Sequence, residues 1–175
     1  MRVDAIRRSL RTKPPQGAET PARREHPNEA MHNGALLLSA ASAAFMAGVI
    51  WVIQLVHYPL FSFADMARFA EFHAQHSARI TLIVMPAMLL ELGSSLALVA
   101  ATEDPLERRA ALLGVGLVGI AWATTAFASV PAHGRLSGGF DAAAHRALVT
   151  TNVLRTVAWS AHAALKFALL AQRLR

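Results

Sequence analysis

Four long apolar stretches divide this chain, and short polar segments separate them. The stretches cover residues 34–58, 80–102, 110–132 and 147–165. Together they contain only two formal charges, Glu91 and Arg155. An α-helix needs about 20 apolar residues to cross the roughly 30 Å hydrocarbon layer of a bilayer. Because these stretches are apolar nearly all round, they lack the polar outer face of a soluble bundle. The pattern predicts an all-α polytopic membrane protein with four transmembrane helices in an up-down bundle.

Prolines and polar segments set the expected limits of the first two helices. The first should run over 34–58 and end at Pro59, which removes a backbone donor and clashes with the preceding turn. The second should run over 80–102, with Pro86 as a kink. Residues 63–79, between them, place apolar side chains and histidines on one face and charged side chains on the other. That segment predicts a short amphipathic helix at the membrane interface.

The last two helices have recognisable starts. Asp104, Pro105 and Glu107 occupy the N-cap, first and third positions expected of a helix start, so a third helix should begin there. It should end at Pro131. After a glycine-containing loop, Asp141 suits the N-cap of a fourth helix over 142–170.

Composition and charge refine this picture without changing it. Charged residues make up 16% of the chain, against roughly 25% in an average soluble domain. Much of the net charge of +6 comes from residues 1–32, a proline-rich basic stretch without hydrophobic periodicity. We interpret 1–32 as a disordered tail and 33–175 as the four-helix transmembrane domain. A basic tail beside a span favours the lipid bilayer over nucleic acid as partner, and it places both termini in the cytoplasm.

The two intramembrane charges are the first candidate site. If the second helix starts near residue 80 and the fourth near residue 144, Glu91 and Arg155 lie at matched depth near the bilayer midplane. A lone charge there costs at least about 2.5–3.5 kcal/mol, so the two side chains are expected to pair. Gln54 and Asn152 extend this polar cluster, whereas Lys166 is expected to extend towards the interface. The cluster either fixes helix register or binds a small ligand.

Histidines form the second candidate site. Five of the eight are expected at the same membrane face, namely His57, His73, His76, His133 and His145. Neutral imidazole is the commonest metal ligand and can also hold haem. The first four are therefore candidate ligands of a metal or haem, although no acidic cluster completes the set. The chain has no cysteine, which excludes disulfides, thiolate metal sites and cysteine nucleophiles.

The segments 54–61, 79–81 and 151–156, together with Glu91, resemble a group of small uncharacterised bacterial membrane proteins with four helices. In number and layout of spans the chain also resembles the anthrone-oxygenase-like membrane proteins. The second resemblance implies oxidation of a small hydrophobic molecule, and no catalytic residue is carried over from it. The preference for arginine over lysine and the abundant alanine indicate a GC-rich bacterial genome, and hence the inner membrane.

Three classes of function remain open. The first is a binding or structural membrane protein whose polar core holds helix register or a small hydrophobic ligand. The second is a membrane enzyme acting on a lipophilic substrate, with Glu91 or His57 as its acid–base group and with haem or metal as a possible cofactor. The third is a small transporter, which would need to assemble as a homo-oligomer because four spans are few.

Overall fold

Long helices joined by short turns make up residues 27–174, the part of the chain that the computed structural model describes. No strand occurs in this part. The four long α-helices are α2 (Pro27–Val52), α3 (Phe69–Ala101), α4 (Pro105–Thr124) and α6 (Ala142–Arg173), and a short α5 (Val130–Leu136) continues the direction of α4. Between them lie the π-turns η1 (Ile53–His57) and η4 (Thr125–Ser129) and the 3₁₀ turns η2 (Pro59–Phe63) and η3 (Met66–Arg68).

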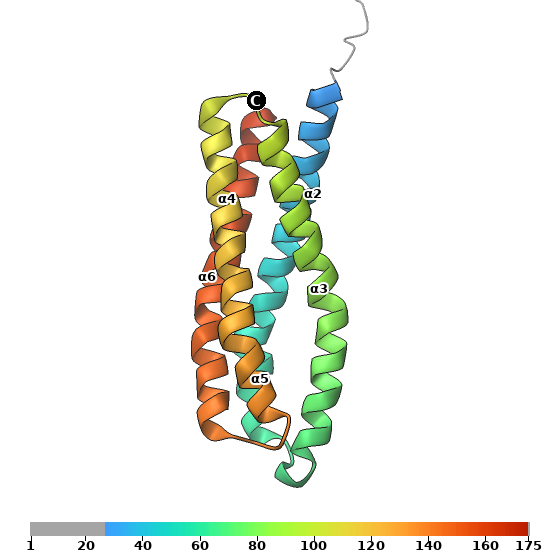
Figure 1. Cartoon of the computed structure of the whole chain (residues 1–175), viewed down its shortest axis with the longest axis vertical. Helices are drawn as coiled ribbons and strands as arrows, with labels where there is room; N and C mark the ends of the chain where they lie inside the picture. Colours follow the sequence, from blue (N-terminus) through green and yellow to red (C-terminus); the bar gives the residue numbers. More distant parts are fainter. Residues whose placement is uncertain (1–26, 175) are drawn as a thin grey trace, which may run out of the picture.

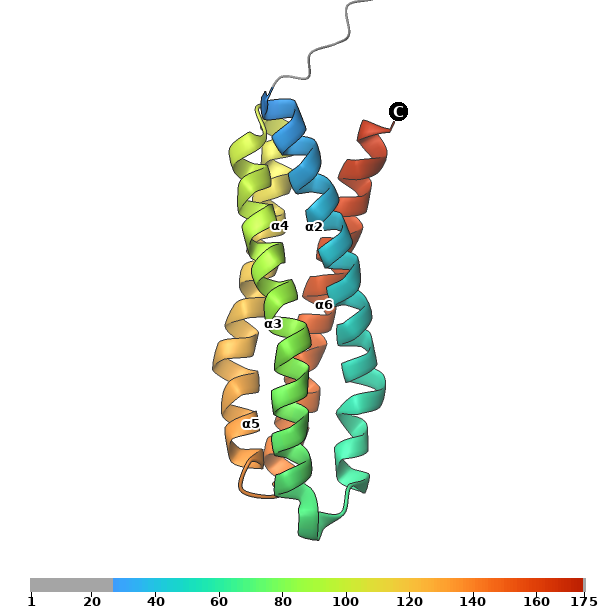
Figure 2. The ribbon, with the colours of Figure 1, turned by 90° about the vertical axis from the view of Figure 1, so that its right-hand side faces the viewer.

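The helices lie roughly antiparallel along one long axis (Figures 1 and 2). The start of α2, the α3–α4 turn and the end of α6 share one end of the bundle, which we call the terminal end. The η2–η3 turns and the α5–α6 loop share the other end, the loop end. The up-down order agrees with the prediction from short connections.

Side-chain caps explain where α4 and α6 begin. The carboxylate of Asp104 accepts a hydrogen bond from the amide of Glu107 at 2.7 Å, as its spacing predicted. Asp141 accepts from the amides of Ala143 and Ala144 at 2.8 and 3.0 Å. The Ala144 amide, followed by the Arg135 guanidinium, holds the pKa of the Asp141 carboxyl below its usual range. Both predicted N-caps are confirmed.

Prolines follow both π-turns, and neither proline ends its helix as sharply as predicted. In η1 the amide of Tyr58 bonds back to the carbonyl of Ile53 at 3.0 Å, just before Pro59. In η4 the amide of Val130 bonds to the carbonyl of Thr125, just before Pro131. The wider turn accommodates a residue that has no amide hydrogen to donate. The helical path therefore continues through Pro131 to Leu136, and the predicted stop at Pro131 is wrong.

Two predicted boundaries also need correction. Residues 69–79 are not a separate interfacial helix but the first turns of α3, because no helix breaker separates them from residue 80 and their buried face continues along the bundle. Residues 27–32, placed in the tail, belong to α2. His32 in that segment is buried and pairs with Glu107 on α4 at 3.0 Å, which anchors the first turns. The rest of the predicted tail, residues 1–26, lies outside the described residues.

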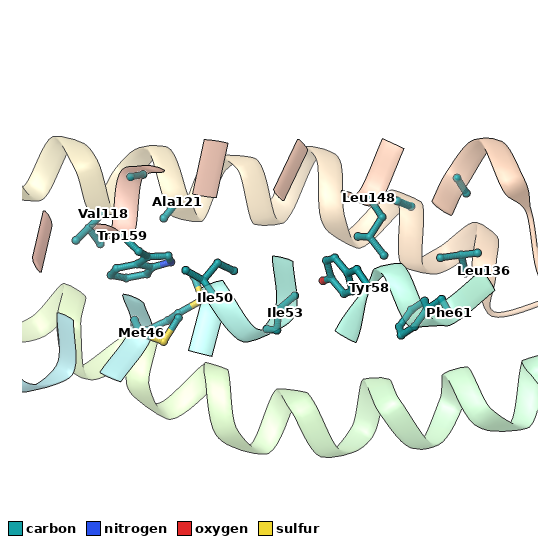
Figure 3. Packing of buried hydrophobic residues seen from close by; sticks show 14 of the residues in the cluster. Met46, Ile50, Ile53, Tyr58, Phe61, Val118, Ala121, Leu136, Leu148 and Trp159 are labelled. Carbon is teal, nitrogen blue, oxygen red and sulfur yellow. The ribbon is translucent and has the colours of Figure 1, made fainter. Parts of the chain in front are cut away.

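Apolar side chains fill the interior and also cover the exterior. Met46, Ile50, Val118, Ala121 and Trp159 pack together in one part of the core (Figure 3). Towards the loop end the same core holds Tyr58, Phe61, Leu136 and Leu148. Large apolar side chains are also exposed along all the long helices, for example Leu82 at 76% and Leu106 at 74%. Such an exterior suits lipid rather than water as the solvent.

Three of the described helical segments are long and apolar enough to cross a membrane: Asn28–Phe63, Met66–Ala101 and Pro105–Leu136. This finding supports a membrane protein. The remaining helix, α6, has comparable length but is more polar, since it carries Arg146, Arg155 and Lys166 as well as two histidines.

Candidate functional site

Polar side chains gather at two separate places inside the bundle. The first, here called the Glu91 centre, consists of Ser39, Ser42, Glu91, Ser95, His162 and Lys166. The second, here called the Arg155 centre, consists of Tyr58, His73, His76, Ser129, His133 and Arg155. It lies nearer the loop end, next to both π-turns. Every member of either centre is buried except His133, which is half-buried.

In the Glu91 centre, one carboxylate is surrounded by hydrogen-bond donors. Oε1 of Glu91 accepts from Ser39 Oγ at 2.6 Å, from Ser95 Oγ at 3.1 Å and from His162 Nε2 at 2.5 Å. Ser42 Oγ donates to Oε2. Glu91 is 0% exposed, and charge-assisted bonds of this kind are what make a buried carboxylate tolerable.

Lys166 places a positive charge in the same centre. It lies one turn beyond His162 on α6 and is fully buried. Its Nζ has no hydrogen-bond or ion-pair partner among residues 27–174, although the charge of Glu91 attracts it. Lys166 and His162 press against the backbone of α4 at Gly114. A Cβ at that position would lie 3.2 Å from Lys166 Nζ and 3.4 Å from His162 Nδ1. The centre therefore contains both signs of charge, and a glycine gives it room.

The predicted ion pair between Glu91 and Arg155 does not form. The partners of Glu91 are His162 and three serines, while Arg155 donates from Nη1 to Ser129 Oγ at 2.7 Å. The prediction assumed that the second helix starts near residue 80. Because α3 starts at Phe69, Glu91 lies about 33 Å along α3 whereas Arg155 lies about 20 Å along α6, at 1.5 Å per residue. The expectation that Lys166 extends to the interface is wrong for the same reason: its depth matches that of Glu91.

A cavity of about 220 Å³ opens beside the Arg155 centre. Its polar wall contains Tyr58, Ser77, Ser129, His133 and Arg155. Its apolar wall comes mainly from α3 and the start of α5, namely Ile80, Val84, Met85, Met88 and Val130, with Ile53 from η1. Met85 and Val130 are 41% and 60% exposed at its edge, so the cavity reaches the lipid-facing surface between α3 and the η4–α5 segment.

The guanidinium of Arg155 has no counter-charge among residues 27–174. None of the ion pairs in this part of the chain includes it, although the side chain is only 4% exposed. Its Nε has no hydrogen-bond partner there either. Its charge acts on Tyr58 and His133, both normally neutral groups. Arginine stays protonated in proteins, so the centre carries a net positive charge in an apolar setting.

The four histidines predicted as metal candidates do come together, but as hydrogen-bonded pairs. His57 Nε2 lies 2.7 Å from His76 Nδ1, and His73 Nε2 lies 2.9 Å from His133 Nδ1. His133 Nε2 lies 3.1 Å from the Tyr58 hydroxyl. Within residues 27–174 no group of three or more His, Asp or Glu side chains is arranged to hold a metal ion. A metal or haem at these residues stays a prediction.

The remaining predicted ligand-binding residues connect helices. Asn152 Nδ2 donates to Gln54 Oε1 at 2.9 Å, which ties α6 to the π-turn η1. Neither side chain belongs to the lining of the cavity next to Arg155. Of the four residues predicted to form one polar cluster, the structure therefore places Gln54 with Asn152, and Glu91 and Arg155 in two different centres.

Ser39, Ser42 and Ser95 of the Glu91 centre escaped the sequence analysis. Ser39 and Ser42 are three residues apart, while Glu91 with Ser95 and His162 with Lys166 are four apart, so each pair shares a helix face. Such polar pairs within apolar stretches could have located the Glu91 centre.

Comparison with known proteins assigns no relative to this chain. No protein-family model, no curated protein and no solved structure matches it. The functional argument therefore depends on the geometry of the two centres.

Proposed function

We propose that this protein is an integral membrane protein that binds a small lipophilic molecule with an anionic head group in the cavity beside Arg155. One observation carries the proposal: a buried arginine without a counter-charge among residues 27–174 forms the polar wall of an otherwise apolar cavity. A carboxylate, phenolate or enolate would supply the missing charge through charge-assisted hydrogen bonds. The hydrocarbon part of the ligand would contact Ile80, Val84 and Met88.

The position of the cavity suits a ligand that arrives from the bilayer. Its opening lies between α3 and the η4–α5 segment, where Met85 and Val130 are exposed. We place the protein in the bacterial inner membrane with four spans, α6 being the fourth, and with both termini in the cytoplasm. A helix with buried charges can span when those charges face the bundle interior, as Arg155 and Lys166 of α6 do. Assembly into a homo-oligomer remains compatible with this arrangement.

A second candidate function is an enzyme that acts on such a ligand. The Tyr58 hydroxyl and His133 Nε2 form a hydrogen bond at the wall of the cavity, and both groups can exchange protons with a bound head group. This pair takes the place of Glu91 as candidate acid–base group, because Glu91 lies in the other centre.

The experiment compares a lipophilic anion with its neutral analogue on protein in lipid nanodiscs. We expect 2-naphthoate to raise the unfolding temperature until its site is saturated. At a concentration of roughly 100 times its dissociation constant, binding should add about 2.7 kcal/mol to the free energy of unfolding. The neutral analogue 2-naphthylmethanol should have little effect. Arg155→Met should abolish the response, whereas Arg146→Met, an exposed arginine on the same helix, should retain it.

Mass spectrometry of organic extracts provides an independent check with natural ligands. Wild-type protein should retain an anionic lipophile that Arg155→Met loses and Arg146→Met keeps. Equal responses of wild type and Arg155→Met in both measurements would contradict the proposed function.

A further inference from the structure

Two hydrogen-bonded chains of side chains, the first of which starts at the cavity, stop inside the protein. In the first, the Tyr58 hydroxyl bonds to His133 Nε2 at 3.1 Å, and His133 Nδ1 bonds to His73 Nε2 at 2.9 Å. In the second, His57 Nε2 bonds to His76 Nδ1 at 2.7 Å. Each chain ends on a buried ring nitrogen without a partner among the described residues, His73 Nδ1 and His76 Nε2.

These two free nitrogens belong to neighbouring rings. The ring centroids of His73 and His76 are 6.2 Å apart, and the side chains are 2% and 8% exposed. A buried polar atom without a partner is costly, and in native proteins an ordered water molecule commonly satisfies such atoms. Two such nitrogens on neighbouring rings provide partners for a bridging water.

We propose that one buried water molecule bridges His73 Nδ1 and His76 Nε2 and joins the two chains into a proton relay. The relay runs from Tyr58 through His133, His73, the water and His76 to His57. His57 is partly exposed and lines a surface groove together with Arg68, Glu71 and Arg79, so this end of the relay can reach water. The other end, Tyr58, lies at the cavity.

The hydrogen-bond pattern allows a proton to travel the whole way. The O–H bond of Tyr58 breaks as an N–H bond forms at His133 Nε2, and His133 passes its Nδ1 proton to His73 Nε2. His73 passes its Nδ1 proton to the water, which protonates His76 Nε2, and His76 passes its Nδ1 proton to His57 Nε2. The products are a Tyr58 phenolate and a His57 imidazolium, so one proton has moved and no electron is required.

Burial and a neighbouring charge act in opposite directions on the Tyr58 phenolate. Burial works against the phenolate, and the guanidinium of Arg155 on α6, which faces Tyr58 and His133, offsets part of that cost. His145, also on α6, bonds to the backbone carbonyl of Tyr58 at 2.8 Å and lies outside the relay. If the proposed function holds, a lipophilic acid can enter from the bilayer in its neutral form, lose its proton to the Tyr58 phenolate, and remain bound to Arg155 as the anion.

Because Tyr58 is the only tyrosine of the chain, its hydroxyl can be observed alone. The experiment labels tyrosine with ¹³C at Cζ and follows hydroxyl hydrogen–deuterium exchange by solid-state NMR in bilayers without added ligand. His57→Phe should slow the exchange by about a hundredfold, the lower end of what a positioned acid–base group contributes. His145→Phe is the matched control, since both histidines are partly exposed and pack on Phe61. The control should exchange as the wild type does.

A second measurement tests the water directly. In ¹⁵N-histidine-labelled wild-type protein, water-edited spectra should show magnetisation transferred from water to the ring nitrogens of His73 and His76. Wild-type exchange rates in His57→Phe, or no water contact at these nitrogens, would overturn the relay. Neither result depends on ligand binding, so the relay can fail while the proposed function stands, and the reverse also holds.

Discussion

The two polar centres of this bundle differ in one respect that decides their roles. Each contains a buried cation on α6, Arg155 or Lys166, about three turns apart along the same helix face. The Glu91 centre also contains a carboxylate and a close set of serine donors. The Arg155 centre contains neutral histidines, a tyrosine and a cavity, but no carboxylate. An internal carboxylate compensates a buried cation within the fold, whereas the proposed function gives the cation without a carboxylate to a ligand.

The backbone also differs between the two centres, being regular around Glu91 and widened around Arg155. Around Glu91 the helices are regular, and Gly114 allows α6 to approach α4 closely. Around Arg155 both α2 and α4 widen into π-turns, which supply Ser129 and precede Tyr58. Widened turns of this type occur frequently at functional sites, since they redirect side chains that a regular helix would turn elsewhere.

Three substitutions test this comparison of the two centres, in order of decreasing effect on stability.

Glu91→Leu should cause the largest loss of stability. Removal of the carboxylate breaks its buried pair with His162 and takes away the negative charge that attracts Lys166, and breaking a buried pair costs about 3–5 kcal/mol. Unfolding in detergent should show this loss, and adding Lys166→Met should restore part of it. Glu71→Leu, at an exposed ion pair with Arg68, is the control and should change stability by about 1 kcal/mol or less. A loss of stability in Glu91→Leu no larger than that in the control would contradict a structural role for this centre.

Arg155→Met should change the stability of the protein in the opposite direction. An intramembrane charge costs about 2.5–3.5 kcal/mol, and the apolar side chain removes this cost, so the ligand-free protein should become more stable by up to that amount. The lost hydrogen bond to Ser129 offsets part of the gain. Unfolding in detergent, as for Glu91→Leu, measures this gain in stability. A loss comparable to that of Glu91→Leu would show that Arg155 is compensated within the fold and would weaken the case for a ligand.

Gly114→Ala should have the smallest effect on stability. The sign of this effect should be opposite to that of the same substitution at Gly116. A Cβ at Gly114 would crowd Lys166 and His162, and the resulting shifts should cost about 1–2 kcal/mol. Gly116→Ala meets nothing within 4 Å and should gain about 0.5–1 kcal/mol from better helix propensity. Thermal unfolding of the two variants side by side measures the difference. Equal effects would mean that Lys166 and His162 do not depend on close contact with α4.

Hydropathy and capping residues predicted much of the fold. The helical class, the up-down order and the starts of α4 and α6 at Asp104 and Asp141 follow from short-range rules that act within a few residues. Proline was less informative, because the rule that it ends a helix holds for a regular α-helix. After a π-turn the helical path continues, as it does through Pro131.

The candidate site was predicted in part. The sequence singled out Glu91, Arg155 and the histidines as unusual within apolar surroundings, and each of them lies in the interior or at the loop-end cluster of histidines. It paired Glu91 with the wrong partner, because the estimate of depth depended on where α3 starts. An error of about eleven residues in that start moves a side chain by about 16 Å along the helix axis.

The sequence alone determined that this chain forms long apolar helices, where two of them begin, and that Glu91 and Arg155 are buried between them. These properties depend on local hydrogen bonding and on the free energy of transferring side chains into an apolar phase. Only the tertiary structure decided that Glu91 meets His162 and its serines, and that Arg155 faces a cavity without a counter-charge. The axial offset and rotation of packed helices determine those contacts, and a pattern of nearly uniform hydrophobicity leaves both undetermined.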